Sequence, residues 1–537
     1  MNLVDQLTGS IAFFKYAADQ PGSRAYTYRS AVHAGARDPS ISSNTSGHRG
    51  AHMDRWVAGG GSGRLVDGSR VIAVARKTCA MTSTERFTDG RLPISPLSGL
   101  FTLESRWQRW LEVEAALARA EADVGIVPRE VADTIAAVAS IDRLDLAQVR
   151  ADMATSSHPL MPLITELARV AGEPAGGWVH WGATTQNITQ TGDAMELRAA
   201  HHALLEMLGD LFAALAALAE RGADLPMAGR THGQQAVPIT FGFKVAGWID
   251  EFSRHLQRLR AVEPRVFTAM LGGAVGNFAS LGPAGPEVQS RLADHLGLTA
   301  MKLPSRAVGD SLAEYVCILA LIAGTGARIA GEVYALSRTE IGELAEPAPK
   351  GTIGSSTMPH KRNPQLADDC LALSAEIRAL VPLALEGMLR DHEVDGAHSD
   401  MTDTAVHRAC LATGALLVRL VTITSDLTLH PDRMRANLEL TGGLLASERV
   451  MLTLGHDVGR QRAHELVHEA AIATSTTTTF LDALAADTRI TAHLTRDQLA
   501  DLLRPEQGLG LSSQLAREAA RTATDLAHQL SDRTDSA

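Results

Sequence analysis

Eleven consecutive residues, 354–364, bring together side chains that could bind carboxylates and move a proton. The run reads Gly-Ser-Ser-Thr-Met-Pro-His-Lys-Arg-Asn-Pro. Its glycine and its two prolines, Pro359 and Pro364, are unfavourable inside a helix or a central strand, so we predict a loop. The side chains that this loop would display are Ser355, Ser356, His360, Lys361, Arg362 and Asn363. A polar surface turn has the same composition, so residue types alone leave both interpretations open.

A second candidate is His232, within Arg230-Thr231-His232-Gly233-Gln234. Histidine exchanges protons near neutral pH, and this one has a hydroxyl, a guanidinium and an amide close by. Pro238 predicts the start of a helix just after the segment. Capping or packing at this loop–helix junction is therefore the alternative to an acid/base role.

A third candidate is the segment 182–187, which reads Gly-Ala-Thr-Thr-Gln-Asn. Its hydroxyls and amides could bind carboxylate oxygens without adding charge. The segment precedes a predicted helix, so a helix cap is the competing interpretation. A weaker fourth candidate is His158, whose apolar neighbours make a packed histidine equally compatible with the sequence.

The run 354–364 resembles the signature loop of the fumarase/aspartase superfamily, Gly-Ser-Ser-x-Met-Pro-x-Lys-x-Asn. The matching residues are Gly354, Ser355, Ser356, Met358, Pro359, Lys361 and Asn363. The ending His-Lys-Arg-Asn-Pro is most similar to the branch that holds 3-carboxy-cis,cis-muconate cycloisomerases and adenylosuccinate lyases. The resemblance begins near Pro96 and extends into the C-terminal part of the chain.

This resemblance implies a role for each candidate. Ser355 would be the catalytic base, and His232 the general acid or the group that orients the leaving group. The implied substrate-binding residues are His158, Thr184, Thr185, Gln186, Asn187, Arg230, Thr231, Ser356, Met358, Lys361 and Asn363. The sequence departs from the family pattern at Pro159, Asn187, Gly233 and Val394. Relatives have an acid at the first two of these positions and commonly an arginine at the last.

The implied reaction is β-elimination from a substituted succinate, a small dicarboxylate, to give fumarate, with neither a metal nor an organic cofactor. Our specific hypothesis is nitrosuccinate, cleaved to fumarate and nitrite in antibiotic biosynthesis. Nitrite leaves without prior protonation, so the aspartate missing at position 187 would matter less. The alternatives are a 3-carboxy-cis,cis-muconate cycloisomerase, an adenylosuccinate-type C–N lyase and a non-catalytic helical scaffold.

Two further motifs are interpreted as structural. His464-Glu465-Leu466-Val467-His468 fits the zinc-protease pattern, but no third ligand stands at the expected spacing, so a solvated helix face is favoured. Gly272-Gly273-Ala274-Val275-Gly276 resembles a phosphate-binding loop, but no predicted strand precedes it and no Lys-Ser/Thr follows. We therefore predict no metal site.

Composition restricts the class of protein. Hydrophobic residues make up 45% of the 537 residues and charged residues 21%, typical of a globular chain. The net charge of −11 argues against a broad nucleic-acid surface. The longest apolar run, 316–324, is too short to span a bilayer, and the N-terminus lacks a secretory pattern. The four cysteines show no metal or disulfide spacing. We predict a cytoplasmic enzyme.

The elements that must position these segments are long amphipathic helices. Apolar residues at helical spacing predict helices over 238–262 and 305–345, the second about 60 Å long. Such helices suggest a bundle extended by self-association. The resemblance implies an all-α fold of three helical domains, completed by a homotetramer whose active sites draw loops from several chains. The predicted parts are an extension at 1–90, an N-terminal domain at 91–200, a central bundle at 201–430 and a C-terminal domain at 431–537.

Overall fold

The structure, a computed structural model, describes residues 86–534, with side-chain burial described for 86–532. It is 68% helical and 5% strand, which confirms the predicted all-α class. Most of the predicted extension, residues 1–85, lies outside the described part of the chain. The remaining residues of that range, 86–90, belong to the folded unit, because Thr88 is buried and Asp89–Arg91 form the 3-10 turn η1.

The N-terminal helices gather around one apolar core. They are α2 (Leu103–Asp123), α3 (Arg129–Val138), α4 (Leu146–Ser156) and α5 (Met161–Ala171). Helix α8 (Gly285–Leu296), although later in the sequence, packs against α2 and adds Val288 and Leu292 to this core. Apolar side chains of α2 recur every three or four residues, including the buried Trp107 and Leu111, so one face of this helix is buried.

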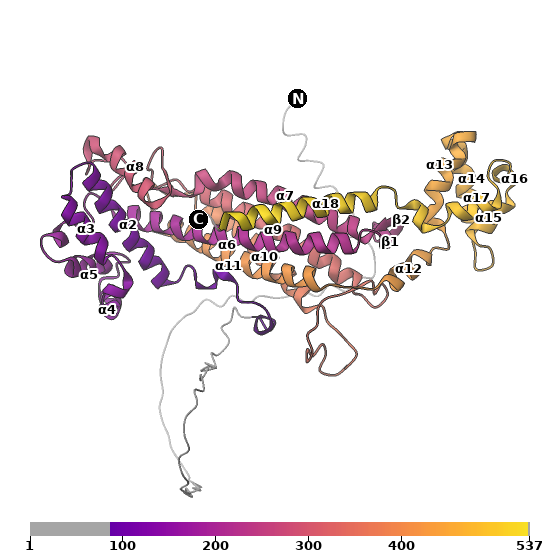
Figure 1. Cartoon of the computed structure of the whole chain (residues 1–537), viewed down its shortest axis with the longest axis horizontal. Helices are drawn as coiled ribbons and strands as arrows, with labels where there is room; N and C mark the ends of the chain where they lie inside the picture. Colours follow the sequence, from indigo (N-terminus) through magenta and orange to yellow (C-terminus); the bar gives the residue numbers. More distant parts are fainter. Residues whose placement is uncertain (1–85, 535–537) are drawn as a thin grey trace, which may run out of the picture. The chain divides into compact units, whose positions relative to one another are not determined.

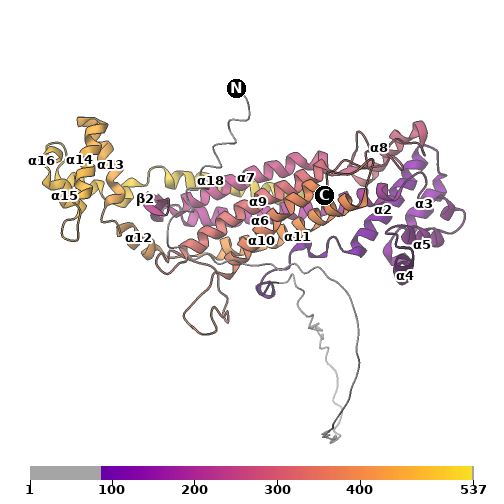
Figure 2. The same ribbon diagram turned by 180° about the vertical axis from the view of Figure 1, so that it is seen from behind.

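Long helices running side by side form the bundle (Figures 1 and 2). They are α6 (Thr185–Arg221), α7 (Phe241–Val266), α9 (Asp310–Leu336), α10 (Gln365–Glu386), α11 (Gly396–Asp426) and α18 (Ser512–Thr534). Two of them, α7 and α9, correspond to the helices predicted over 238–262 and 305–345. Helix α9 is shorter than predicted, because the chain turns after Ser337 and then forms a strand.

The C-terminal helices have a separate small core that includes Phe480, Leu466 and Leu499. The helices of this core are α13 (Ser447–Val458), α14 (Arg460–Ile472), α15 (Phe480–Ala486), α16 (Thr488–Thr491) and α17 (Arg496–Leu502). Helix α12 (Pro431–Glu439) precedes them and adds Met434 to the core of the bundle instead. The last helix, α18, packs along α6 and α7 rather than on this core. The division into three domains stays a prediction. Helix α18 falls within the predicted C-terminal domain, 431–537, but it packs on the bundle.

The described residues also contain short strands that form three two-stranded sheets. Strands β1 (Pro226–Thr231) and β2 (Gln234–Thr240) form an antiparallel hairpin. The shorter pairs are β3 (Thr268–Ala269) with β4 (Thr299–Ala300), and β5 (Leu344–Ala345) with β6 (Thr428–Leu429). The prediction that Pro238 starts a helix is wrong, because Pro238 pairs with Ala228 inside the hairpin. Helix α7 starts three residues later, where the Thr240 hydroxyl caps it by accepting the Phe243 N–H.

Among the described residues 86–534, three helices are long and apolar enough to cross a membrane, which the short apolar run 316–324 did not reveal. They are α6, α9 and α11. Packing inside the protein accounts for much of their apolar character, since 67%, 56% and 67% of their most apolar windows is buried. Of the three helices, α9 has the largest exposed share of its apolar window, and its Leu321 side chain is 50% exposed.

Candidate active site

The signature loop lies between β5 and α10 and is mostly exposed, as the sequence predicted. Within it, the half-buried Ser355 hydroxyl oxygen accepts hydrogen bonds from the backbone N–H groups of Met358 (3.1 Å) and Thr357 (3.4 Å). Asn363 closes the loop by donating from Nδ2 to the Gly354 carbonyl oxygen (2.7 Å). Gly354 is required sterically, because a Cβ there would overlap the Lys361 carbonyl oxygen.

These contacts bear on whether Ser355 can act as a base. A free serine hydroxyl holds its proton too strongly for that role. Backbone N–H groups aimed at its oxygen favour the negatively charged alkoxide, as donors in an oxyanion hole do. The other loop residues predicted to bind substrate are exposed and open to a ligand: Ser356, Met358, Lys361 and Asn363.

His232 stands at the tip of the β1–β2 hairpin. His232 and Gly233 form its two-residue turn, with φ of 52° and 76°. Positive φ at both positions is typical of a type I′ turn, in which glycine is unstrained and histidine is tolerated. The turn exposes His232 and the adjacent Thr231, so both are accessible to a ligand.

Arg230, also predicted to bind substrate, has a partner within its own chain. Its guanidinium donates from Nη1 (2.9 Å) and Nη2 (2.6 Å) to the two carboxylate oxygens of Glu343. Asn437 Nδ2 donates to the same carboxylate (2.7 Å), and Glu343 is fully buried. The pair fastens the hairpin to the residues just before β5, and therefore near the start of the signature loop.

The segment Thr184–Asn187 forms the beginning of α6. Asn187 is buried, and its Oδ1 accepts the N–H groups of Thr184 and Gly273, each at 3.1 Å. Thr184 is the N-cap residue, and Thr184 and Thr185 are both partly exposed. Gln186 pairs with Arg306, accepting from its Nε (2.8 Å) and donating to its carbonyl oxygen (3.2 Å). Asn187 therefore helps to cap the start of α6, as the competing interpretation predicted, and its contact with substrate stays a prediction.

Replacing Asn187 with leucine is expected to destabilise the protein by about 2–4 kcal/mol, because the buried N–H of Gly273 and the part-buried N–H of Thr184 would lose their acceptor. Asn187→Asp is the matched control, since a carboxylate oxygen can accept the same two bonds at a helix N-terminus. We expect the control to change stability by about 1 kcal/mol or less. Thermal unfolding at fixed protein concentration measures both variants. A leucine variant that unfolds with the wild type would contradict the assignment.

His158 lies just before α5 and is half-buried. Its Nδ1 accepts the backbone N–H groups of Leu160 (3.2 Å) and Met161 (2.9 Å). An acceptor at Nδ1 places the proton of the neutral ring on Nε2. His158 can therefore offer one hydrogen-bond donor to a ligand, which is compatible with its predicted role.

The structure gathers the predicted residues into two places within one chain. Helix α6 has 37 residues, so its ends are about 55 Å apart. The segment Thr184–Asn187 lies at its start, and the hairpin follows its end. The base of the signature loop lies near the hairpin, because Arg230 of the hairpin forms an ion pair with Glu343, which directly precedes β5. His158 belongs with the first group, because its neighbour Pro159 and Gln186 line the same cavity.

This cavity has a volume of about 930 Å³. Its walls are the first turns of α6, the segment before α9, the beginning of α11 and Arg106 of α2. Arg106 forms a bidentate salt bridge with Asp193, and both N–O distances are 2.9 Å. Arg390 donates from Nη1 to the Arg306 carbonyl oxygen (2.8 Å). Burial and the neighbouring Asp193 raise the pKa of Asp403, so this carboxyl keeps its proton to a higher pH than usual.

Sequence reasoning missed these cavity residues. The fold brings Arg106, Arg306 and Arg390 together from separate segments, and Arg265 lines the same cavity. No short motif marks them, since Arg106, Arg306 and Arg390 are far apart in the chain. Among residues 86–534, no group of three or more histidine, cysteine or acidic side chains is placed to hold a metal ion. His464 and His468 stack on each other, with ring centroids 6.0 Å apart.

Comparison with known proteins agrees with a lyase built from a long-helix bundle. The family described as "Lyase" matches residues 89–378, and the one described as "Adenylosuccinate lyase C-terminus" matches residues 443–519. The chain belongs to the fumarase/aspartase superfamily of lyases.

Curated relatives and a solved structure give the same family. An N-acetyl-S-(2-succino)cysteine lyase of Enterococcus italicus is 41% identical over 76% of this chain and 90% of the relative. A 3-carboxy-cis,cis-muconate cycloisomerase of Pseudomonas aeruginosa is 37% identical over 79% of this chain and 93% of the relative. The crystal structure of a fumarate lyase from Mesorhizobium sp. BNC1 superposes with a TM-score of 0.74 at 34% identity. The superposition covers 79% of this chain and 97% of the fumarate lyase chain.

Proposed function

We propose that this enzyme catalyses β-elimination from a succinyl thioether of an N-acylated cysteine, releasing fumarate and the free thiol. The observation that carries the elimination is the Ser355 hydroxyl oxygen, which accepts backbone N–H groups of Met358 and Thr357 in an intact signature loop. A non-catalytic scaffold would not need this arrangement.

In this proposal, Ser355 removes the proton on the carbon next to one carboxylate. The electron pair is held as an aci-carboxylate by Lys361, Asn363 and hydroxyls such as those of Thr184 and Thr185. It then forms the carbon–carbon double bond as the carbon–sulfur bond breaks. The sulfur leaves with that bond's electrons, and His232 supplies a proton to it or orients it. The step is redox-neutral and draws on side chains of this protein alone.

Two findings support a thioether over nitrosuccinate. One is the 41% identity to a relative named for a succinylated N-acetylcysteine. The other is the cavity of about 930 Å³ beside Gln186, near the upper end of the usual range for small-molecule sites. Its arginines and carboxyls suit a leaving group with an amide and a carboxylate. Nitrite would leave most of this space without contacts.

We also propose that the active site is completed by other copies of the chain, in a cytoplasmic homotetramer. The support is the separation of about 55 Å between the Thr184–Asn187 segment and the hairpin, too far for one substrate to bridge. The incompletely buried face of α9, with Leu321 half-exposed, is a surface that a second copy could cover.

A substrate panel tests the proposed reaction. We expect fumarate absorbance and thiol release to rise together with N-acetyl-S-(2-succinyl)cysteine. Its kcat/KM should exceed those for nitrosuccinate and adenylosuccinate by at least about tenfold, the selectivity that one to two kcal/mol of binding gives. Equal turnover of nitrosuccinate would overturn the thioether assignment. Consumption of 3-carboxy-cis,cis-muconate without fumarate from any succinyl compound would overturn elimination itself.

A further inference from the structure

The signature loop is fastened at its base by one carboxylate. The chain leaves β5 at Ala345 and enters α10 at Gln365, and Glu346 stands where the loop begins. Its two carboxylate oxygens accept the N–H of Leu366 (3.1 and 3.0 Å), and one of them also accepts the N–H of Ala367 (3.1 Å). These N–H groups belong to the first turn of α10 and have no partner within the helix. Glu346 therefore ties the entry of the loop to its exit.

The Glu346 carboxylate is paired with an arginine from a distant part of the chain. Its side chain is 8% exposed, and Nη2 of Arg91 lies 3.8 Å from its Oε1. Burial raises the pKa of Glu346, whereas the bonds from α10 and the positive charge of Arg91 oppose that rise. The Arg91 Nε and Nη2 atoms are buried and have no hydrogen-bond partner among residues 86–534. The ion pair with Glu346 is thus the contact that engages this end of Arg91.

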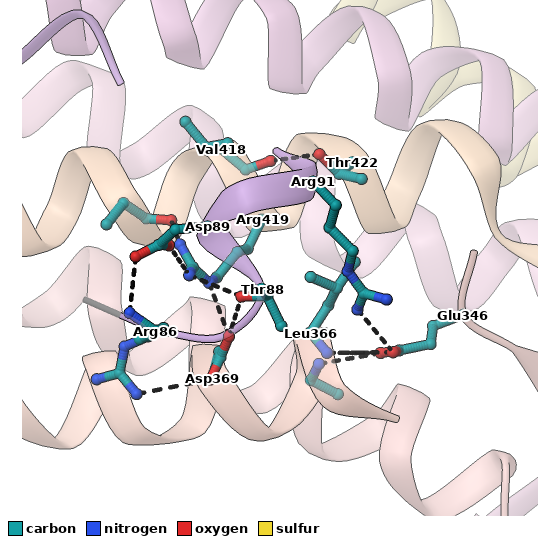
Figure 3. A network of polar contacts seen from close by, with 12 residues as sticks. Arg86, Thr88, Asp89, Arg91, Glu346, Leu366, Asp369, Val418, Arg419 and Thr422 are labelled. Atoms are coloured by element: carbon teal, nitrogen blue, oxygen red, sulfur yellow. Dashed lines mark hydrogen bonds and ion pairs between the residues drawn. The ribbon is translucent and has the colours of Figure 1, made fainter. Parts of the chain in front are cut away.

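Arg91 is itself held by anchors that do not involve the loop. Figure 3 shows the segment 86–91 lying across α10 and α11. There Arg419, which is 2% exposed, donates to the Thr88 hydroxyl (2.9 Å) and pairs with Asp89 and with Asp369 (3.2 Å). The segment is therefore fixed to the bundle independently of the loop, and Arg91 acts from a rigid position.

We propose that Arg91 is a positioning residue for catalysis: through Glu346 it holds the base of the loop so that Ser355 is presented in its reactive geometry. This inference rests on the proposed role of Ser355 as base. A link between Arg91 and the loop predicts that loss of the arginine loosens the loop and slows turnover without removing any group that touches the substrate.

The test combines hydrogen exchange and kinetics on the full-length Arg91→Gln, Glu346→Gln and double variants. In Arg91→Gln we expect the amides of Leu366 and Ala367 to exchange about tenfold faster. Its kcat should fall about tenfold to a hundredfold, with KM changed far less, because a small misplacement of a reacting group is costly. The double variant should be no worse than Glu346→Gln alone, since both substitutions break one link. Arg91→Lys, which keeps the charge, should recover most of kcat.

Arg86→Gln is the matched control. Arg86 lies on the same segment but pairs with Asp369 (3.6 Å) and Glu376 (3.7 Å) rather than with Glu346. The proposal is overturned if Arg91→Gln speeds exchange at Leu366 and Ala367 no more than this control. The proposal is also overturned if the losses of kcat in Arg91→Gln and Glu346→Gln multiply in the double variant, because independent effects would mean that the two residues do not act through one link. Hydrogen exchange is measured without substrate, so it does not depend on the role of Ser355. If the assignment of Ser355 is wrong, Ser355→Ala will be fully active while Arg91→Gln still speeds exchange at Leu366 and Ala367.

Discussion

Ser355→Ala is expected to lower kcat for fumarate release by about 10³-fold, the range that a positioned general base contributes. The substitution removes the oxygen that accepts the N–H groups of Met358 and Thr357, and with it the group proposed to take the proton. Because the loop is exposed, the free energy of unfolding should change by less than about 1 kcal/mol. Fumarate absorbance measures the rate, and thermal unfolding shows that the protein remains folded.

Ser356→Ala is the control for this prediction. Ser356 is the neighbouring hydroxyl, is exposed, and is proposed to contact substrate rather than to remove the proton. Its loss should act mainly on KM, with kcat within about tenfold of the wild type, as expected for a single substrate hydrogen bond. A Ser355→Ala enzyme that keeps more than a tenth of the wild-type kcat would remove Ser355 as the base. The reverse ranking of the two variants would assign the role to Ser356.

Arg230→Met is expected to destabilise the folded protein by about 3–5 kcal/mol, the cost of leaving a buried carboxylate without its charged partner. Glu343 is fully buried, and the Arg230 side chain is only 18% exposed. Asn437 would still donate to Glu343, but an amide does not neutralise the charge. The shift in thermal unfolding, measured at one protein concentration because assembly adds to stability, gives the size of the effect.

The double variant Arg230→Met/Glu343→Met separates a structural role for Arg230 from a substrate-binding role. Replacing both members of a buried ion pair by apolar residues is often nearly neutral. The double variant should therefore unfold closer to the wild type than Arg230→Met does. If Arg230→Met instead unfolds normally and only raises KM, the guanidinium binds substrate and the Glu343 pair is not its main role.

Local sequence determined the loop, the fold class and the family. Gly354, Pro359 and Pro364 together are unfavourable inside a helix or a central strand, so the loop was predictable from backbone preferences. Apolar residues at helical spacing likewise predicted the two long helices, which the structure has as α7 and α9. The hairpin around His232 was missed, because a pair of short strands depends on partners across the turn rather than on a periodic pattern.

The sequence by itself determined which residues are candidates for the chemistry: Ser355 in its glycine- and proline-bounded loop and His232 beside Gly233. These candidates come from local features, because the side-chain types and the family resemblance lie within a few positions of each residue. Only the tertiary structure decided which charged groups serve the fold. It paired Arg230 with Glu343, turned Asn187 into a helix cap, and brought Arg106, Arg306 and Arg390 to one cavity. The physical reason is that burial makes an unpaired charge or N–H group costly, and the partner that satisfies it can come from anywhere in the chain.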